Sequence, residues 1–186
     1  MSTKTRLTVL GLALGLGAGS IVWAQSRPQD SMKKPFGDKE DVAFAQKTWK
    51  AMEGYRDWKL TTDVFAGASP HGKWVRLYST WVNVDGQAYP IIIKDNFGGR
   101  GASPETIGKD PDHFLKAVTI MLQRRPGYDP DNNDWFWVKF KPDGSVEKNA
   151  MDMPLAGRVA KGMPRGCISC HSQAEGDDYL FSNDEE

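Results

Sequence analysis

The sequence holds few of the residues on which metal-cluster and disulfide proteins depend, since only two cysteines and three histidines occur among 186 residues. A zinc site at the cysteines would need further ligands, and His71 and His113 are the only histidines away from them. An excess of basic charge is also missing, because 24 lysines and arginines balance 24 aspartates and glutamates. Binding to nucleic acid therefore has no support. The sequence shows no internal repeat and no low-complexity tract, so one ordinary domain is expected.

The sequence also lacks an apolar run long enough to cross a membrane. Residues 7–21 are apolar and glycine-rich, but these 15 residues fall short of the roughly 20 that a spanning helix needs. Lys4 and Arg6 precede the run, and Ala24 follows it as a small residue suited to cleavage. The pattern predicts a bacterial-type signal peptide over residues 1–24. We therefore expect export to the periplasm, with no membrane anchor after the signal peptide is removed.

The most informative segment is Cys167-Ile168-Ser169-Cys170-His171, which uses both cysteines of the chain. The spacing C-x-x-C-H is typical of covalently attached haem. In that chemistry the two thiols add across the vinyl groups of haem, and the adjacent imidazole becomes an axial ligand of the iron. The sequence therefore predicts one haem c, held by Cys167 and Cys170, with His171 as a ligand of the iron.

Three other interpretations of the two cysteines stay open. A thioredoxin-like pair would need a βα unit around it, whereas Met163-Pro164-Arg165-Gly166 precedes this pair and a polar, acidic tail follows it. A zinc site would have to recruit ligands from elsewhere in the chain. A disulfide between residues three apart would close a small, strained loop that constrains little of the unfolded chain.

The rest of the sequence predicts a mixed fold. Polar residues 25–39 are expected to form a leader to a domain over residues 40–186. Periodicity predicts strands over residues 73–83, 89–94, 117–122 and 134–141, and helices over residues 38–55 and 155–161, although 117–122 also fits a helix. Asp85-Gly86 indicates a hairpin whose polar flanks predict a loop longer than two residues. The fold class is therefore α+β, with an antiparallel sheet of about four or five strands, flanking helices, and haem c attached near the C-terminus.

Five segments follow one another in a recognisable order: residues 71–78, 89–95, 134–137, 166–171 and 178–181. In this order they resemble the cytochrome P-460 and cytochrome c′-beta family, over most of the mature domain, with the haem motif as the most specific segment. Members of this family are periplasmic monohaem proteins, usually homodimers, whose five-coordinate iron meets hydroxylamine, nitric oxide or related small molecules. The resemblance implies small nitrogen compounds as ligands, a homodimer, and a soluble redox partner such as another cytochrome.

The resemblance also assigns roles to Lys94 and Arg76. In the hydroxylamine-oxidising branch a strand ends in a lysine that is linked covalently to the porphyrin edge, and Lys94 matches that lysine. A shift of one residue in this strand would turn Lys94 away from the haem. Arg76 matches a family arginine near the haem pocket that donates to a bound oxygen or to a propionate. Without the resemblance, Lys94 reads as a solvated residue at a sheet edge, and Arg76 as the partner of an acid on the sheet face.

The sequence leaves three functions open. Oxidation of hydroxylamine removes protons as well as electrons and would be assisted by a positioned base, but residues 117–121, where the family has its carboxylate, contain no acid. Binding of nitric oxide, as in the c′-beta branch, needs no base. Plain electron transfer would need a second axial ligand, for which His71 is a candidate. Ser69-Pro70 and Gly72, however, predict a surface turn around His71.

Overall fold

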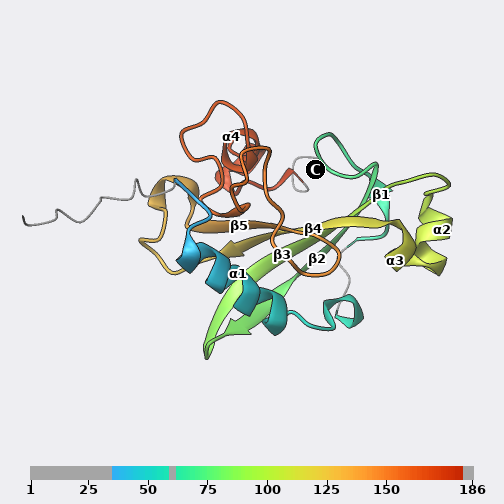
Figure 1. Cartoon of the computed structure of the whole chain (residues 1–186), viewed down its shortest axis with the longest axis horizontal. Helices are drawn as coiled ribbons and strands as arrows, with labels where there is room; N and C mark the ends of the chain where they lie inside the picture. Colours follow the sequence, from blue (N-terminus) through green and yellow to red (C-terminus); the bar gives the residue numbers. More distant parts are fainter. Residues whose placement is uncertain (1–34, 59–61, 182–186) are drawn as a thin grey trace, which may run out of the picture. The chain divides into compact units, whose positions relative to one another are not determined.

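The computed structural model describes residues 35–58 and 62–181, and Figure 1 shows how their helices and strands are arranged. The predicted signal peptide and residues 25–34 of the predicted leader lie outside the described residues. Within the described part of the chain, no helix combines the length and the apolar character that crossing a membrane requires.

The sheet has six antiparallel strands in the order β1-β2-β3-β4-β5-β6, so each strand lies beside its neighbour in sequence. The strands are β1 (Phe65–Ala66), β2 (Trp74–Val84), β3 (Gln87–Phe97), β4 (Leu115–Gln123), β5 (Trp135–Phe140) and β6 (Ala156–Gly157). The predicted α+β fold with an antiparallel sheet is confirmed. The four long strands are those that the sequence predicts, and the two-residue strands β1 and β6 extend the sheet at its edges.

The hairpin between β2 and β3 is tighter than predicted. Val84 pairs with Gln87, so the loop consists of Asp85 and Gly86 alone. Both residues have positive φ angles, 53° and 80°, as a two-residue turn between twisted strands requires. The prediction of a longer loop was wrong because the polar residues beside the turn continue the strand pairing.

The predicted helix over residues 155–161 is also absent, and part of this segment forms β6. Gly157 pairs with Trp137 of β5 and has a φ of 92°, which a helix does not allow. An added Cβ at Gly157 would stand 2.2 Å from a carboxylate oxygen of Asp41, so the backbone here lies directly against α1. The close approach and the strand pairing explain why helical spacing misled the prediction.

The first helix begins where the sequence predicts. The Asp38 carboxylate accepts hydrogen bonds from the backbone N–H groups of Glu40 and Asp41, at 2.9 and 2.8 Å, and so caps α1 (Lys39–Ala51). The helix ends earlier than predicted, because Gly54 adopts a φ of 74° and a 3-10 turn follows. The remaining short helices are η1 (Tyr55–Asp57), α2 (Pro104–Lys109), α3 (Pro111–Phe114), η2 (Pro130–Asn132), α4 (Cys167–His171) and η3 (Glu175–Asp177).

The two faces of the sheet carry different layers, because residues alternate between the faces and cross-strand partners share one. On the face that we call the core face, α1 packs through Phe44, whose ring lies 4.9 Å from that of Phe136. On the opposite face, which we call the site face, Ile168 of α4 packs in a cluster with Trp137. Figure 1 shows α1 and α4 on opposite sides of the strands.

Candidate functional site

The short helix α4 holds both thiols and the candidate axial ligand within five residues. It follows Gly166, which has a φ of 145° and lies so close to Ala160 that an added Cβ would stand 2.2 Å from the Ala160 Cβ. Only glycine fits this position. Cys167 is half-buried and Cys170 is exposed, and the two form no disulfide. The structure thus leaves both thiols available for covalent attachment.

The surroundings of the thiols argue against a thioredoxin-like or zinc-binding role. Burial raises the pKa of the Cys167 thiol to about 11. A disulfide-exchanging pair needs the opposite shift, because the thiolate is its nucleophile. Within residues 35–58 and 62–181, no group of three or more histidine, cysteine, aspartate or glutamate side chains is placed to hold a metal ion.

His171 is oriented as an iron ligand would be. Its Nδ1 lies 2.8 Å from the carbonyl oxygen of Tyr179, and since a carbonyl only accepts, Nδ1 carries the proton. Nε2 is then the atom with a free lone pair, and such a second hydrogen bond is the usual support of a metal-binding histidine. Burial lowers the pKa of His171, which favours the neutral ring that binds metals.

Lys94 lies on the site face beside the two thiols. It stands opposite Leu77 of β2 and Thr119 of β4, so β3 is an interior strand and the alternative of a sheet-edge lysine does not apply. Burial lowers the pKa of Lys94 to about 8, and the interaction with Cys167 and Cys170 opposes this shift. Its Nζ makes no hydrogen bond or ion pair with any other described residue.

Arg76 is not brought together with the other predicted site residues. It stands opposite Asp95 in the pairing of β2 with β3. Asp95 follows Lys94 directly and so points to the other face, which means that Arg76 projects from the core face. Its guanidinium lies 5.8 Å from the ring centre of Phe97, and its charge acts on the buried carboxylate of Asp95. This is the placement of the second interpretation, an arginine beside an acid on the sheet face.

His71 reaches the site face from the loop between β1 and β2. The predicted turn is present, but it packs against β3. An added Cβ at Gly72 would stand 2.5 Å from the carbonyl oxygen of Phe97, so the two backbones are in close contact. The ring centres of His71 and His171 are 6.1 Å apart, with the planes at 85°. Burial, reinforced by the charges of Lys94 and His171, lowers the pKa of His71 to about 4.

One carboxylate approaches the site face from a segment that the sequence did not suggest. Lys139 of β5 stands opposite Thr119, and its Nζ lies 2.8 Å from the Glu147 carboxylate. The charge of Lys139 acts on His71. Glu147 comes from the turn after β5, where a bridge returns the chain to that strand. No periodic pattern marks such a return, so a search for an acid within residues 117–121 could not find Glu147.

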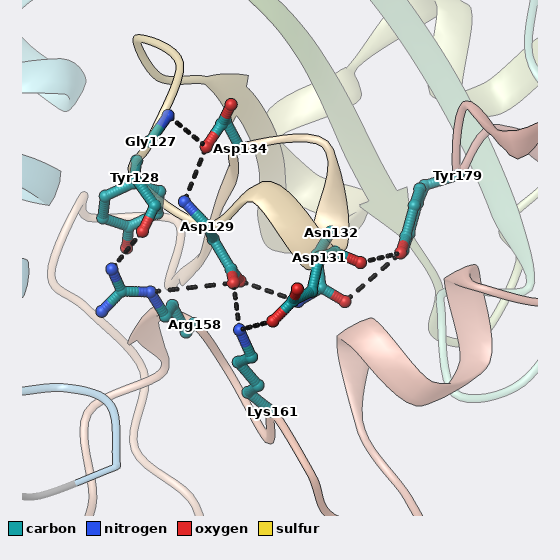
Figure 2. Close-up of polar contacts among 9 residues, drawn as sticks. All are labelled: Gly127, Tyr128, Asp129, Asp131, Asn132, Asp134, Arg158, Lys161 and Tyr179. Carbon is teal, nitrogen blue, oxygen red and sulfur yellow. Dashed lines mark hydrogen bonds and ion pairs between the residues drawn. The ribbon is translucent and has the colours of Figure 1, made fainter.

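A polar cluster between β4 and β5 supports the segment that holds His171 (Figure 2). The buried carboxylate of Asp129 accepts hydrogen bonds from Lys161 and, at 2.9 Å, from Asn132. Lys161 also lies 3.0 Å from the Asp131 carboxylate. The Tyr179 hydroxyl donates to the Asp131 carbonyl at 3.1 Å, so the residue that accepts from His171 is itself tied to η2.

The residues of the site face fit an attached haem. One buried polar atom on this face, Trp137 Nε1, has no hydrogen-bond partner among the described residues. Trp137 lies 4.9 Å from the His171 ring, measured between ring centres, and its N–H suits a carboxylate such as a haem propionate. With the two free thiols and the Nε2 lone pair of His171, the face offers attachment, ligation and hydrogen bonding to one cofactor.

Comparison with known proteins gives one match. The family model described as Cytochrome P460 matches residues 52–182, a range that includes all six strands, the loop of His71, and α4. No curated protein matches the chain, and no solved structure does.

Proposed function

Because the chain belongs to the cytochrome P460 family, we propose that it is a haem c protein that binds small nitrogen compounds and oxidises hydroxylamine. The observation that carries the proposal is the position of Lys94, whose amine lies on the site face beside both thiols and has no hydrogen-bond or ion-pair partner among the described residues. A half-buried lysine that no described carboxylate pairs with is costly, and such residues are concentrated at functional sites.

Each residue of the site face has a part in this proposal. Cys167 and Cys170 hold the haem, and His171 binds its iron through Nε2 while Tyr179 keeps the proton on Nδ1. When bound, the haem supplies an iron that exchanges single electrons and coordinates small molecules. Lys94, whose pKa burial lowers to about 8, holds an appreciable fraction of unprotonated amine near neutral pH, which suits the porphyrin link that the family resemblance implies.

Oxidation of hydroxylamine also requires an acceptor for protons. Glu147 is the candidate for this role, because its carboxylate lies 2.8 Å from Nζ of Lys139, a residue of the site face. We further propose export to the periplasm, association as a homodimer, and electron transfer to a soluble partner such as another cytochrome.

The optical spectrum of the purified protein, first ferric and then reduced with dithionite, tests the proposal. We expect a high-spin ferric iron and a ferrous Soret band shifted strongly to the red, because a lysine link alters the porphyrin itself. Addition of hydroxylamine to the ferric protein should then reduce an added cytochrome. An ordinary high-spin ferrous haem c spectrum without turnover would instead assign the protein to binding of nitric oxide.

A second candidate function, electron transfer without catalysis, is favoured by the separation of His71 and His171. Two imidazoles that bind one metal ion through bonds of about 2 Å have ring centres roughly 6 Å apart. The observed separation is 6.1 Å. The same distance also fits an ordinary edge-to-face contact of two rings, in which His71 leaves the iron open. The two arrangements differ in the spin state of the iron.

Replacement of His71 by alanine separates these two functions. If the iron is open, as the first proposal requires, His71→Ala leaves the high-spin spectrum unchanged. His113→Ala is the matched control, since His113 is exposed on α3. A native low-spin spectrum that becomes high-spin in His71→Ala, but not in His113→Ala, would show that the protein is a bis-histidine electron carrier.

A further inference from the structure

We propose that Tyr179 is a positioning residue for the axial histidine, with two parts of one residue acting in series. Its carbonyl oxygen holds the Nδ1–H of His171, and its hydroxyl anchors that carbonyl to η2. The inference rests on the proposed binding of haem iron by His171. It adds that Tyr179, a residue outside the haem motif, affects the reduction potential of the iron.

The hydrogen bond to Tyr179 sets the orientation of the His171 ring. Nδ1 lies 2.8 Å from the Tyr179 carbonyl oxygen, a normal length for a well-formed bond. Three other rings adjoin the imidazole, and its centre lies 4.9 Å from that of Trp137, 5.5 Å from that of Phe181 and 6.1 Å from that of His71. These rings confine the imidazole, but among the described residues none of them hydrogen-bonds either of its nitrogens. The carbonyl is therefore the group that directs Nε2.

The backbone conformation at Tyr179 is one that an aromatic residue rarely adopts. Its φ is 69°, in the left-handed region, and Gly176 and Asp177 just before it have φ angles of 76° and 57°. For a bulky side chain this conformation is a true outlier and persists only where surrounding contacts impose it. The strained turn directs the Tyr179 carbonyl back toward α4, eight residues after His171.

Side-chain contacts to the loop before β5 hold this turn. The Tyr179 hydroxyl donates to the Asp131 carbonyl at 3.1 Å and lies 3.3 Å from Asn132 Oδ1 (Figure 2). Trp135 donates its indole N–H to the Asp178 carbonyl at 3.2 Å, and the Asn133 amide donates to the Asp177 carbonyl. The turn is thus fastened at three successive residues.

The receiving loop is itself rigid, because a buried carboxylate organises it. Asp129 accepts from Asn132 and Lys161, as Figure 2 shows, and its backbone N–H donates to the Asp134 carboxylate at 2.7 Å. Breaking one contact of a buried, charged group is costly, so the loop has one favoured arrangement. The Tyr179 hydroxyl therefore finds its acceptors already in place.

A fixed acceptor at Nδ1 has a direct chemical consequence. A strong Nδ1–H···O=C bond makes the imidazole a better electron donor to a metal at Nε2. Greater donation favours ferric iron and lowers the reduction potential, since second-shell hydrogen bonds tune haem iron. Loosening the Tyr179 carbonyl should therefore raise the potential without removing the haem or its ligand.

The test is Tyr179→Phe in the haem-loaded protein, with the midpoint potential as the readout. This change removes the hydroxyl anchors and keeps the ring. We expect the equilibrium to shift about threefold toward the reduced form, which is roughly +30 mV for one electron. Tyr128→Phe is the matched control, because the buried Tyr128 hydroxyl has no hydrogen-bond partner among the described residues. The midpoint potential of this variant should therefore equal that of the wild type.

Two further measurements keep the result decisive. If Tyr179→Phe loads haem and its potential equals that of Tyr128→Phe, the positioning role is refuted while the proposed function stands. If His171→Ala leaves the iron spectrum unchanged, His171 is not the ligand and the proposed function fails together with the inference. Should Tyr179→Phe fail to load haem, Asn132→Ala removes the second acceptor of the hydroxyl, and a smaller shift of the same sign is expected.

Discussion

Replacement of Lys94 by methionine is expected to abolish the red shift of the ferrous Soret band and to reduce hydroxylamine oxidation at least about 100-fold, the usual cost of losing a group that acts in the reaction. Methionine fills a similar volume but has no amine to link to the porphyrin. Because Lys94 makes no hydrogen bond or ion pair with other described residues, its loss leaves no partner unsatisfied. Optical spectra and steady-state rates with hydroxylamine would measure both effects.

Lys139→Met is the matched control for this experiment. Lys139 stands on the same face, opposite Thr119, but it is paired with Glu147. Its replacement should keep the red-shifted band and should slow turnover less than the loss of Lys94 does. If both variants keep the band and the rate, Lys94 has no part in the chemistry, and the protein is better described as a carrier of nitric oxide or of electrons.

The largest effect on stability is expected from Asp95→Ala, at about 3–5 kcal/mol of unfolding free energy. The Asp95 side chain has no exposed surface, accepts from the Tyr55 hydroxyl, and lies 3.1 Å from Nε of Arg56. Its removal would leave the Tyr55 hydroxyl without its acceptor on the core face and the half-buried Arg56 guanidinium with only the exposed Asp112 as a partner. Urea unfolding of the variant and of the wild type, both loaded with haem, measures the difference.

Asp112→Ala isolates the contribution of burial, because Asp112 binds the same arginine from the surface. Its side chain is 81% exposed, against 0% for Asp95. An exposed ion pair contributes about 0–1 kcal/mol, so this variant should unfold close to the wild type. Equal losses for Asp95→Ala and Asp112→Ala would contradict a stabilising role of the buried pair. The haem spectrum should not change in either variant, since both contacts avoid the site face.

The long strands were predictable because the residue pattern of each segment is by itself typical of a strand. Alternation of side chains marks β2, a run of aromatic residues marks β5, and the two-residue period of a strand places Lys94 and Asp95 on opposite faces. The errors fall where tertiary contacts decide. The segment around Gly157 resembles a helix in sequence, but pairing with Trp137 and contact with Asp41 make it a strand.

The site was predictable only where a motif or a strand carries it. C-x-x-C-H predicted the attachment residues, and the family resemblance, not the strand pattern, drew attention to Lys94. The approach of His71 depends on how a glycine-containing turn packs on β3, and the position of Glu147 depends on a chain reversal after β5. The support of His171 by Tyr179 depends on a left-handed backbone that no residue type announces. These three features depend on tertiary packing, which the spacing of residues along the sequence does not reveal.

The order of the strands has a consequence for how the cofactor is acquired. Every strand from β1 to β5 pairs with its neighbour in sequence, and the last of them ends at Phe140, well before α4. Such local pairings shorten the loops that folding must close. The pairings that build the face bearing Lys94 therefore use no residue of α4, so the sheet and the proposed site of haem attachment are separable parts of the fold.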